Sequence, residues 1–174
     1  PSRISDRLEI YLAKTLFPRS RMCGKMIETV SRQGGRTMKM PKENIDSIMF
    51  APCGMNCMVC YRNCYHKKPC AGCLEGDRGK PEHCRACKIK DCIKEKGLSY
   101  CFQCPEYPCT QIKNLERSYN RRYQASLMEN SRHVQDHGLE SFMEEQKKRY
   151  TCKRCKGIIS LHDRVCSECQ EKMG

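Results

Sequence analysis

Residues 152–169 read CKRCKGIISLHDRVCSEC, in which the four cysteines follow the pattern C-x2-C-x10-C-x2-C. Each C-x2-C turn can point two thiolates at one ion, and the residues between the two pairs can fold as a short hairpin. Four soft sulfur ligands in a closed tetrahedron suit a structural Zn²⁺ ion. The spacing therefore predicts a zinc ribbon with these ligands: Cys152, Cys155, Cys166 and Cys169. His162 lies between the two pairs and could replace a thiolate, but with four cysteines available a role as a hairpin residue is the plainer interpretation.

The composition of the whole chain also points to bound metal. The chain has 174 residues, of which 17 are cysteine, and Leu, Ile, Val and Phe together make up less than a sixth. With 30% charged residues and no Trp, this composition is typical of chains too poor in apolar side chains to fold unaided. We therefore expect a small metal-stabilised α+β fold in which sulfur-bound ions supplement the hydrophobic core.

Disulfide bonds are the other common use of so many cysteines. The first residues, PSRISDRLEIYLAKTLF, lack the apolar core of a secretory signal, and no apolar run reaches the roughly 18 residues that a membrane span needs. In a reducing cytosol, cysteines at C-x2-C spacing are metal ligands rather than disulfides. We expect a cytoplasmic protein without membrane contact.

The cysteines divide the chain into four predicted segments. Residues 1–48 form a basic N-terminal extension, partly helical or disordered, with a short amphipathic helix that starts near Ile4 and ends at Pro18. Residues 49–110 form an irregular cysteine-rich multi-zinc module, 111–150 a helical hairpin linker, and 151–174 the ribbon. In the linker, apolar residues from Ile112 to Leu127 share one helix face, Gly138 ends that helix, and a second helix begins at Leu139.

The twelve cysteines of the central module divide evenly into three four-thiolate sites, which gives about four zinc sites with the ribbon and leaves only Cys23 over. Two C-x2-C-x4-C repeats, CRACKIKDC and CFQCPEYPC, suggest two similar metal-binding turns. The spacing is compatible both with ribbon-like pairs and with an interleaved grouping. His66 and His83 adjoin cysteine pairs, and either could replace a thiolate as a ligand. The predicted central ligands are Cys53, Cys57, Cys60, Cys64, Cys70, Cys73, Cys84, Cys87, Cys92, Cys101, Cys104 and Cys109.

An iron–sulfur cluster is the alternative for the central module. Cys53, Cys57 and Cys60 follow C-x3-C-x2-C, the spacing with which radical-SAM enzymes hold a cluster. Those enzymes need most of a β/α barrel of roughly 200 residues or more, and no alternation of strands and helices is visible here. An iron–sulfur redox protein or cluster-dependent enzyme that uses this turn remains the second hypothesis.

No pattern of His, Cys and carboxylate residues suggests a nucleophile with its base, and a catalytic zinc keeps an open position. The sequence therefore favours a non-enzymatic binding or adaptor module. Four Zn²⁺ ions, each held by four thiolates, would lower the formal charge of +13 to about +5. Nucleic acid is the favoured partner and another protein the alternative. The candidate contacts with nucleic acid recur at every fourth residue on one predicted helix: Lys113, Arg117 and Arg121. A basic helix face that simply contacts solvent is the plainer interpretation of the same spacing.

Several motifs together resemble one family. APCGMNCMVC, CAGC, HCRACKIKDC and KGLSYCFQCPEYPC are similar to the cysteine-rich family catalogued as domain of unknown function 3795. NRRYQASLMEN, GLESFMEEQ and CKRCKGIISLHDRVCSEC resemble the branch that ends in a zinc ribbon, so the resemblance spans about residues 50–170. It implies a small intracellular protein that binds zinc, and it implies no activity. Many members lack an equivalent of Cys64, which makes Cys64 the least secure predicted ligand.

Overall fold

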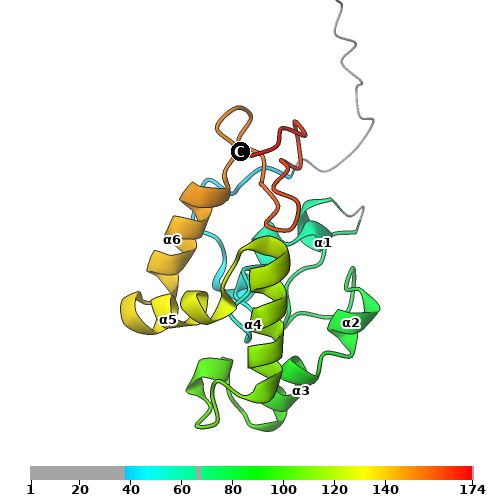
Figure 1. Ribbon diagram of the computed structural model, residues 1–174. Coiled ribbons are helices and arrows are strands. Elements are labelled where there is room, and N and C mark those ends of the chain that lie inside the picture. The colour runs from blue at the N-terminus through cyan, green and yellow to red at the C-terminus, as the bar shows by residue number, and fades with distance from the viewer. Residues whose placement is uncertain (1–37, 66–67, 174) are drawn as a thin grey trace, which may run out of the picture. The chain divides into compact units, whose positions relative to one another are not determined.

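Helices provide the regular secondary structure of the computed structural model, which describes residues 38–65 and 68–173. The described residues all belong to one structural unit. The predicted N-terminal helix, Cys23 and His66 lie outside them. In chain order the elements are η1 (Ser47–Met49), η2 (Cys57–Val59), α1 (Tyr61–Cys64), α2 (Glu82–Arg85), α3 (Lys88–Glu95), η3 (Cys101–Gln103), α4 (Thr110–Tyr123), α5 (Leu127–His137) and α6 (Leu139–Tyr150) (Figure 1).

Helices in the cysteine-rich part are short because turns interrupt them, and cysteines occupy several of their ends. Cys60 is the N-cap of α1, Cys87 that of α3 and Cys109 that of α4, each with extended backbone. An N-cap residue lies next to main-chain N–H groups that have no partner inside the helix. These N–H groups are therefore available to hydrogen-bond a thiolate at the cap.

The cysteine-free segment contains three helices, so the predicted two-helix hairpin is wrong in number. The apolar spacing from Ile112 to Leu127 stays in register, but Gln124 adopts a left-handed conformation with φ 51° and ends α4. Ser126 then caps α5 by accepting a hydrogen bond from the Glu129 main-chain N–H at 2.9 Å. A serine followed three residues later by glutamate is a helix-start signal, and it decides the break.

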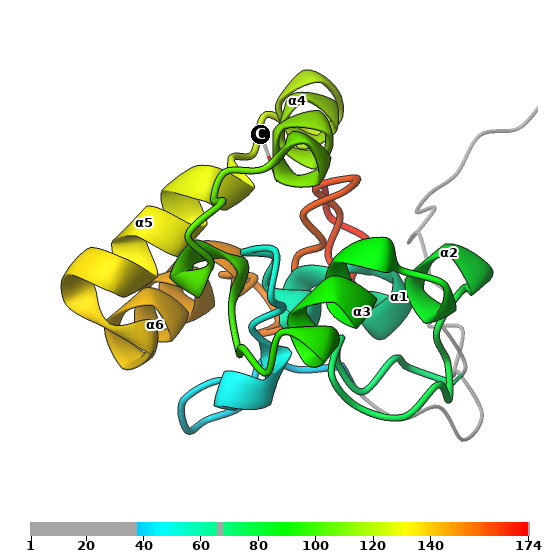
Figure 2. The same ribbon diagram turned by 90° about the horizontal axis from the view of Figure 1, so that it is seen from below.

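The carboxylate of Glu116 holds this break in place. It accepts hydrogen bonds from the main-chain N–H groups of Leu127 and Met128 at 2.7 and 3.1 Å, and from the Ser126 hydroxyl at 2.6 Å. The predicted stop at Gly138 is confirmed, because this glycine has φ 85° and separates α5 from α6. Both views show α5 and α6 packed beside each other (Figures 1 and 2).

Phe50 lies at the centre of the main hydrophobic core. Its ring is fully buried and makes edge-on contacts with Tyr100 and Phe142, with 5.3 Å between ring centroids in both cases. The core also includes Met40 and Ile45, which the sequence places in the N-terminal extension. Residues distant in sequence therefore contribute to one hydrophobic cluster.

In the described residues, β-pairing occurs only as isolated bridges, and no strand is formed. The ribbon contains antiparallel bridges between Thr151 and Ile158, between Ile159 and Cys166, and between Val165 and Lys172. Its tight turns interrupt each pairing after a single residue pair. The α+β class is thus not confirmed, and the described fold is small, cysteine-rich and helical. None of its helices is long and apolar enough to cross a membrane.

Candidate metal centres

The four ribbon cysteines converge on one point. Their sulfur atoms all lie within 4.8 Å of one another. Two of these separations join one turn to the other, at 3.7 Å for Cys152 and Cys169 and 3.5 Å for Cys155 and Cys166. A tetrahedral zinc ion with Zn–S bonds of about 2.3 Å implies sulfur separations of about 3.8 Å, whereas a disulfide needs about 2.05 Å. This spacing fits four ligands of one metal ion.

Two turns of the same construction carry these cysteines. In the first, the Lys156 N–H donates to the Cys152 carbonyl at 2.9 Å, and the Cys152 N–H donates back to the Gly157 carbonyl at 2.9 Å. In the second, the Gln170 N–H donates to the Cys166 carbonyl at 3.1 Å. Lys156 and Gln170 both adopt left-handed backbone, with φ 63° and 60°. The repeated geometry makes the site approximately symmetric.

Main-chain N–H groups prepare the first sulfur of each turn for a metal. The N–H groups of Cys155 and Arg154 point at the Cys152 sulfur, and the pKa of this thiol is lowered to about 7. For Cys166, burial raises the pKa, and the two corresponding N–H groups oppose that effect. Hydrogen bonds of this kind favour the thiolate, the form that binds metal.

His162 does not join the four sulfur atoms. Its ring lies among Tyr61, Tyr119 and Tyr123, with ring centroids 5.3, 6.0 and 4.6 Å away. Its Nδ1 accepts a hydrogen bond from the Tyr61 N–H at 3.4 Å, and burial lowers the pKa of the imidazole. These contacts agree with its predicted role as a hairpin residue.

The central cysteines are less tightly gathered. Outside the ribbon, no group of three or more His, Cys, Asp or Glu side chains among the described residues comes within 4.8 Å. Burial raises the pKa of Cys53 to about 12, and nearby thiolates at Cys73, Cys101 and Cys87 would raise it further. Burial also raises the pKa of Cys57, where Cys73 is the main neighbouring thiolate. Cys53 and Cys57 therefore face cysteines from later in the chain.

Cys60 faces a different set of neighbours. Burial raises its pKa to about 11, and the neighbouring thiolates at Cys84 and Cys70 add to this. Cys84 in turn has Cys70 as its main thiolate neighbour. The neighbours Cys57 with Cys73 and Cys60 with Cys70 fit the ribbon-like pairs, whereas Cys60 with Cys84 fits an interleaved grouping, so the grouping stays a prediction. This arrangement offers no support for an iron–sulfur cluster on the C-x3-C-x2-C turn, because its cysteines do not converge on one point.

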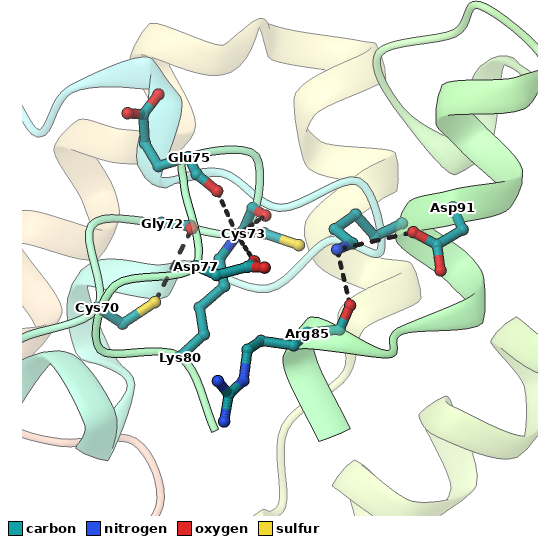
Figure 3. A network of polar contacts seen from close by, with 9 residues as sticks. Cys70, Gly72, Cys73, Glu75, Asp77, Lys80, Arg85 and Asp91 are labelled. Carbon is teal, nitrogen blue, oxygen red and sulfur yellow. Dashed lines mark hydrogen bonds and ion pairs between the residues drawn. The ribbon is translucent and has the colours of Figure 1, made fainter. Parts of the chain in front are cut away.

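A buried lysine, which the sequence analysis missed, holds the loop around Cys73 (Figure 3). The Lys80 side chain is only 2% exposed, and its ammonium lies 3.7 Å from the Asp77 carboxylate. It donates to the carbonyls of Cys73, at 2.8 Å, and of Glu75. Burial raises the pKa of Cys73 to about 11, and the positive charge of Lys80 acts in the opposite direction. A lysine before a proline in a loop carries no sequence signal for such a role.

Cys64 differs from the other predicted ligands. It is 2% exposed in the main core, and its thiol donates a weak hydrogen bond to the Met58 carbonyl at 3.5 Å. Burial is the largest of the causes that raise its pKa. This environment favours a structural role for Cys64.

The remaining central ligands, Cys92, Cys101, Cys104 and Cys109, line one small cavity, while the candidate substitute His83 is exposed. On α4, the predicted basic row of Lys113, Arg117 and Arg121 is also exposed. The Arg117 guanidinium donates to the Asn114 side chain at 3.1 Å. Exposure is equally a property of a solvated helix face, so nucleic-acid contact stays a prediction.

The segment that contains the central cysteines matches a known protein family. The family described as "Protein of unknown function (DUF3795)" matches residues 49–114. The match confirms the predicted resemblance to DUF3795 and ends inside α4, so membership of a ribbon-bearing branch stays a prediction. No curated protein and no solved structure matches the chain.

Proposed function

We propose that this protein is a non-enzymatic zinc-binding module in which sulfur-bound ions help to hold the fold. One observation carries the proposal: the four ribbon sulfur atoms lie within 4.8 Å of one another. Four thiolates complete the coordination of a zinc ion and leave no position for a substrate. The ion would then act as a structural centre, and the cytosol would keep its ligands reduced.

The expected contribution of such an ion is large compared with the stability of a small domain. Structural zinc sites in finger-type peptides have apparent binding free energies of about 10–16 kcal/mol, and folded proteins are stable by about 5–15 kcal/mol. The ribbon contributes Ile158, Ile159 and Leu161 to the main hydrophobic core. We therefore propose that loss of the ribbon's ion would unfold the ribbon and also disturb that core.

The test is elemental analysis and an absorbance spectrum of the reduced, anaerobically purified full chain. The proposal expects zinc and a colourless protein. Iron with acid-labile sulfide and a visible absorbance band would replace it with the iron–sulfur hypothesis. Chelation should then abolish cooperative unfolding, followed by circular dichroism, and zinc should restore it. Unchanged unfolding of the metal-free chain would contradict the structural role.

The proposed partner of this module is nucleic acid, with another protein as the alternative. Lys113, Arg117 and Arg121 are exposed at successive turns of α4, a spacing that can follow phosphates. Replacing all three by Gln should weaken binding to RNA or single-stranded DNA and reduce its dependence on salt. Binding that is insensitive to salt, or unchanged in this variant, would exclude the basic row as the contact.

A further inference from the structure

Four cysteines surround one cavity beside α3 and the start of α4. We infer that Cys92, Cys101, Cys104 and Cys109 form a second thiolate site for a soft divalent metal ion such as Zn²⁺. The inference rests on the proposed function in one respect only, that the thiols of this chain bind metal. It assigns one group among the twelve central cysteines, a grouping that spacing leaves open.

Each of the four cysteines has a defined place in the secondary structure. Cys92 lies on α3, Cys101 begins η3, Cys104 caps the end of η3, and Cys109 is the N-cap of α4. The Cys101 N–H donates to the Pro52 carbonyl at 2.9 Å, and the Cys104 N–H donates to the Cys101 carbonyl at 3.0 Å. Helix ends and main-chain hydrogen bonds thus hold the four side chains around the cavity.

The size of the cavity selects its ligand. Its volume is about 30 Å³, and a cavity needs roughly 10–15 Å³ to hold one water molecule. Pockets for organic ligands are about ten times larger or more, at 300–1,000 Å³. Aliphatic residues, including Ile89, Ile93 and Ile112, supply much of the remaining wall. A single ion held by sulfur fits this volume, and an organic substrate does not.

Charges next to the cavity also favour thiolates. The Lys96 ammonium lies 3.4 Å from the Cys104 sulfur and 3.2 Å from the Glu106 carboxylate. A cation that donates to a ligand sulfur stabilises its deprotonated form, as outer-shell partners do in metal sites.

This site would close around its ion, whereas the ribbon sulfurs are already close together. The cavity sulfurs do not lie within 4.8 Å of one another as a group, so rotation of the cysteine side chains must bring them together. Cys84, from the first of the two repeats, instead has Cys70 and Cys87 as its thiolate neighbours. Cys92 therefore joins the second repeat, and the two repeats do not form equivalent sites.

The first test counts zinc in the reduced, zinc-loaded full chain. Two matched double variants each remove one C-x2-C pair: Cys101→Ser with Cys104→Ser for the cavity, and Cys152→Ser with Cys155→Ser for the ribbon. Each should lose about one zinc ion per chain, since four thiolates hold one ion, and Cys64→Ala should lose none. A cavity variant with the zinc content of the parent would overturn the inference and leave the ribbon unaffected. A parent chain without zinc would overturn the proposed function as well.

The second test uses the unmodified chain, so that it does not depend on how the variants fold. Thiol alkylation is followed residue by residue by mass spectrometry while chelator is added to the zinc-loaded protein. Cys92, Cys101, Cys104 and Cys109 should be protected by zinc and should become reactive together at one chelator concentration. Cys64 should react equally with and without zinc. Alkylation of the cavity cysteines at the same rate in both forms would exclude the site.

Discussion

The ribbon and the α3–α4 cavity each gather four cysteines, but they differ in how closely the chain brings the sulfur atoms together. In the ribbon, two copies of one turn bring sulfur atoms to 3.5 and 3.7 Å across the site. In the cavity, only Cys101 and Cys104 share a C-x2-C turn, and Cys92 and Cys109 come from two helices. Ligands placed by local turns are already assembled, whereas ligands placed by packed helices must still close on the ion.

The largest expected effect is on stability. Removing the ribbon pair, Cys152→Ser with Cys155→Ser, should abolish zinc-dependent stabilisation of the ribbon, on the order of 10 kcal/mol. Removing the cavity pair, Cys101→Ser with Cys104→Ser, should have a smaller effect, because closing the cavity sulfurs uses part of the binding free energy. Thermal unfolding by circular dichroism in excess zinc measures both. A larger loss for the cavity pair would reverse the comparison.

The second expected effect is the order in which zinc leaves as the pH falls. Protons compete with the metal for each thiolate. A thiol of lower pKa takes up its proton, and so releases the metal, only at a lower pH. The pKa of Cys152 is lowered to about 7 by main-chain N–H groups, but burial raises the pKa of Cys166 in the ribbon and of Cys101 in the cavity, each to about 12. The order therefore depends on geometry: the ribbon sulfurs are already assembled within 4.8 Å of one another, and the cavity sulfurs are not. Zinc should leave the cavity at a higher pH than it leaves the ribbon. Residue-resolved alkylation across a pH series would detect the opposite order.

The same pKa shifts have a defined sign in the metal-free chain. The raised pKa of Cys101 means that folding favours its protonated form. This contribution to stability is fully present below the ordinary value of 9.0 and is lost as the pH rises through about 12. The lowered pKa of Cys152 has the reverse effect: its contribution is present above 9.0 and is lost as the pH falls through about 7. The comparison therefore extends to the protein without metal.

A smaller effect is expected from one glycine of the ribbon. A Cβ atom on Gly157 would lie 2.6 Å from the Cys166 sulfur, so Gly157→Ala should displace a ligand and cost about 1–3 kcal/mol. Gly76→Ala is the matched control, because a Cβ atom there meets nothing within 4 Å. Zinc affinity and unfolding temperature should fall only in the Gly157 variant. Equal behaviour of the two variants would show that the ribbon sulfurs are not closely held.

The smallest effect separates a core thiol from a ligand. Cys64→Ala should reduce stability by about 1 kcal/mol, a typical value for a point substitution, and should leave the zinc content unchanged. The physical reason is that Cys64 packs in the main core and donates to the Met58 carbonyl. Loss of a zinc ion in this variant would return Cys64 to the set of ligands that its spacing predicts.

The errors of the sequence analysis have identifiable physical causes. The helix break at Gln124 was not predicted, because the apolar spacing continues across it. Ser126 and Glu129 nevertheless form a helix-start signal in the sequence. The α+β class was inferred from hairpin spacing, but tight turns with left-handed residues prevent a strand in the described ribbon. The role of Lys80 depends on burial, which its neighbours in sequence do not reveal.

The sequence by itself determined the convergence of the four ribbon cysteines and the stop at Gly138, because both depend on residues close together in the chain. The four cysteines fall within residues 152–169, where turn geometry alone can bring sulfur atoms together. Only the tertiary structure decided which central cysteines become neighbours and that Phe50 packs between Tyr100 and Phe142. The physical reason is that these contacts join residues far apart in the chain, whose approach depends on the packing of every element between them.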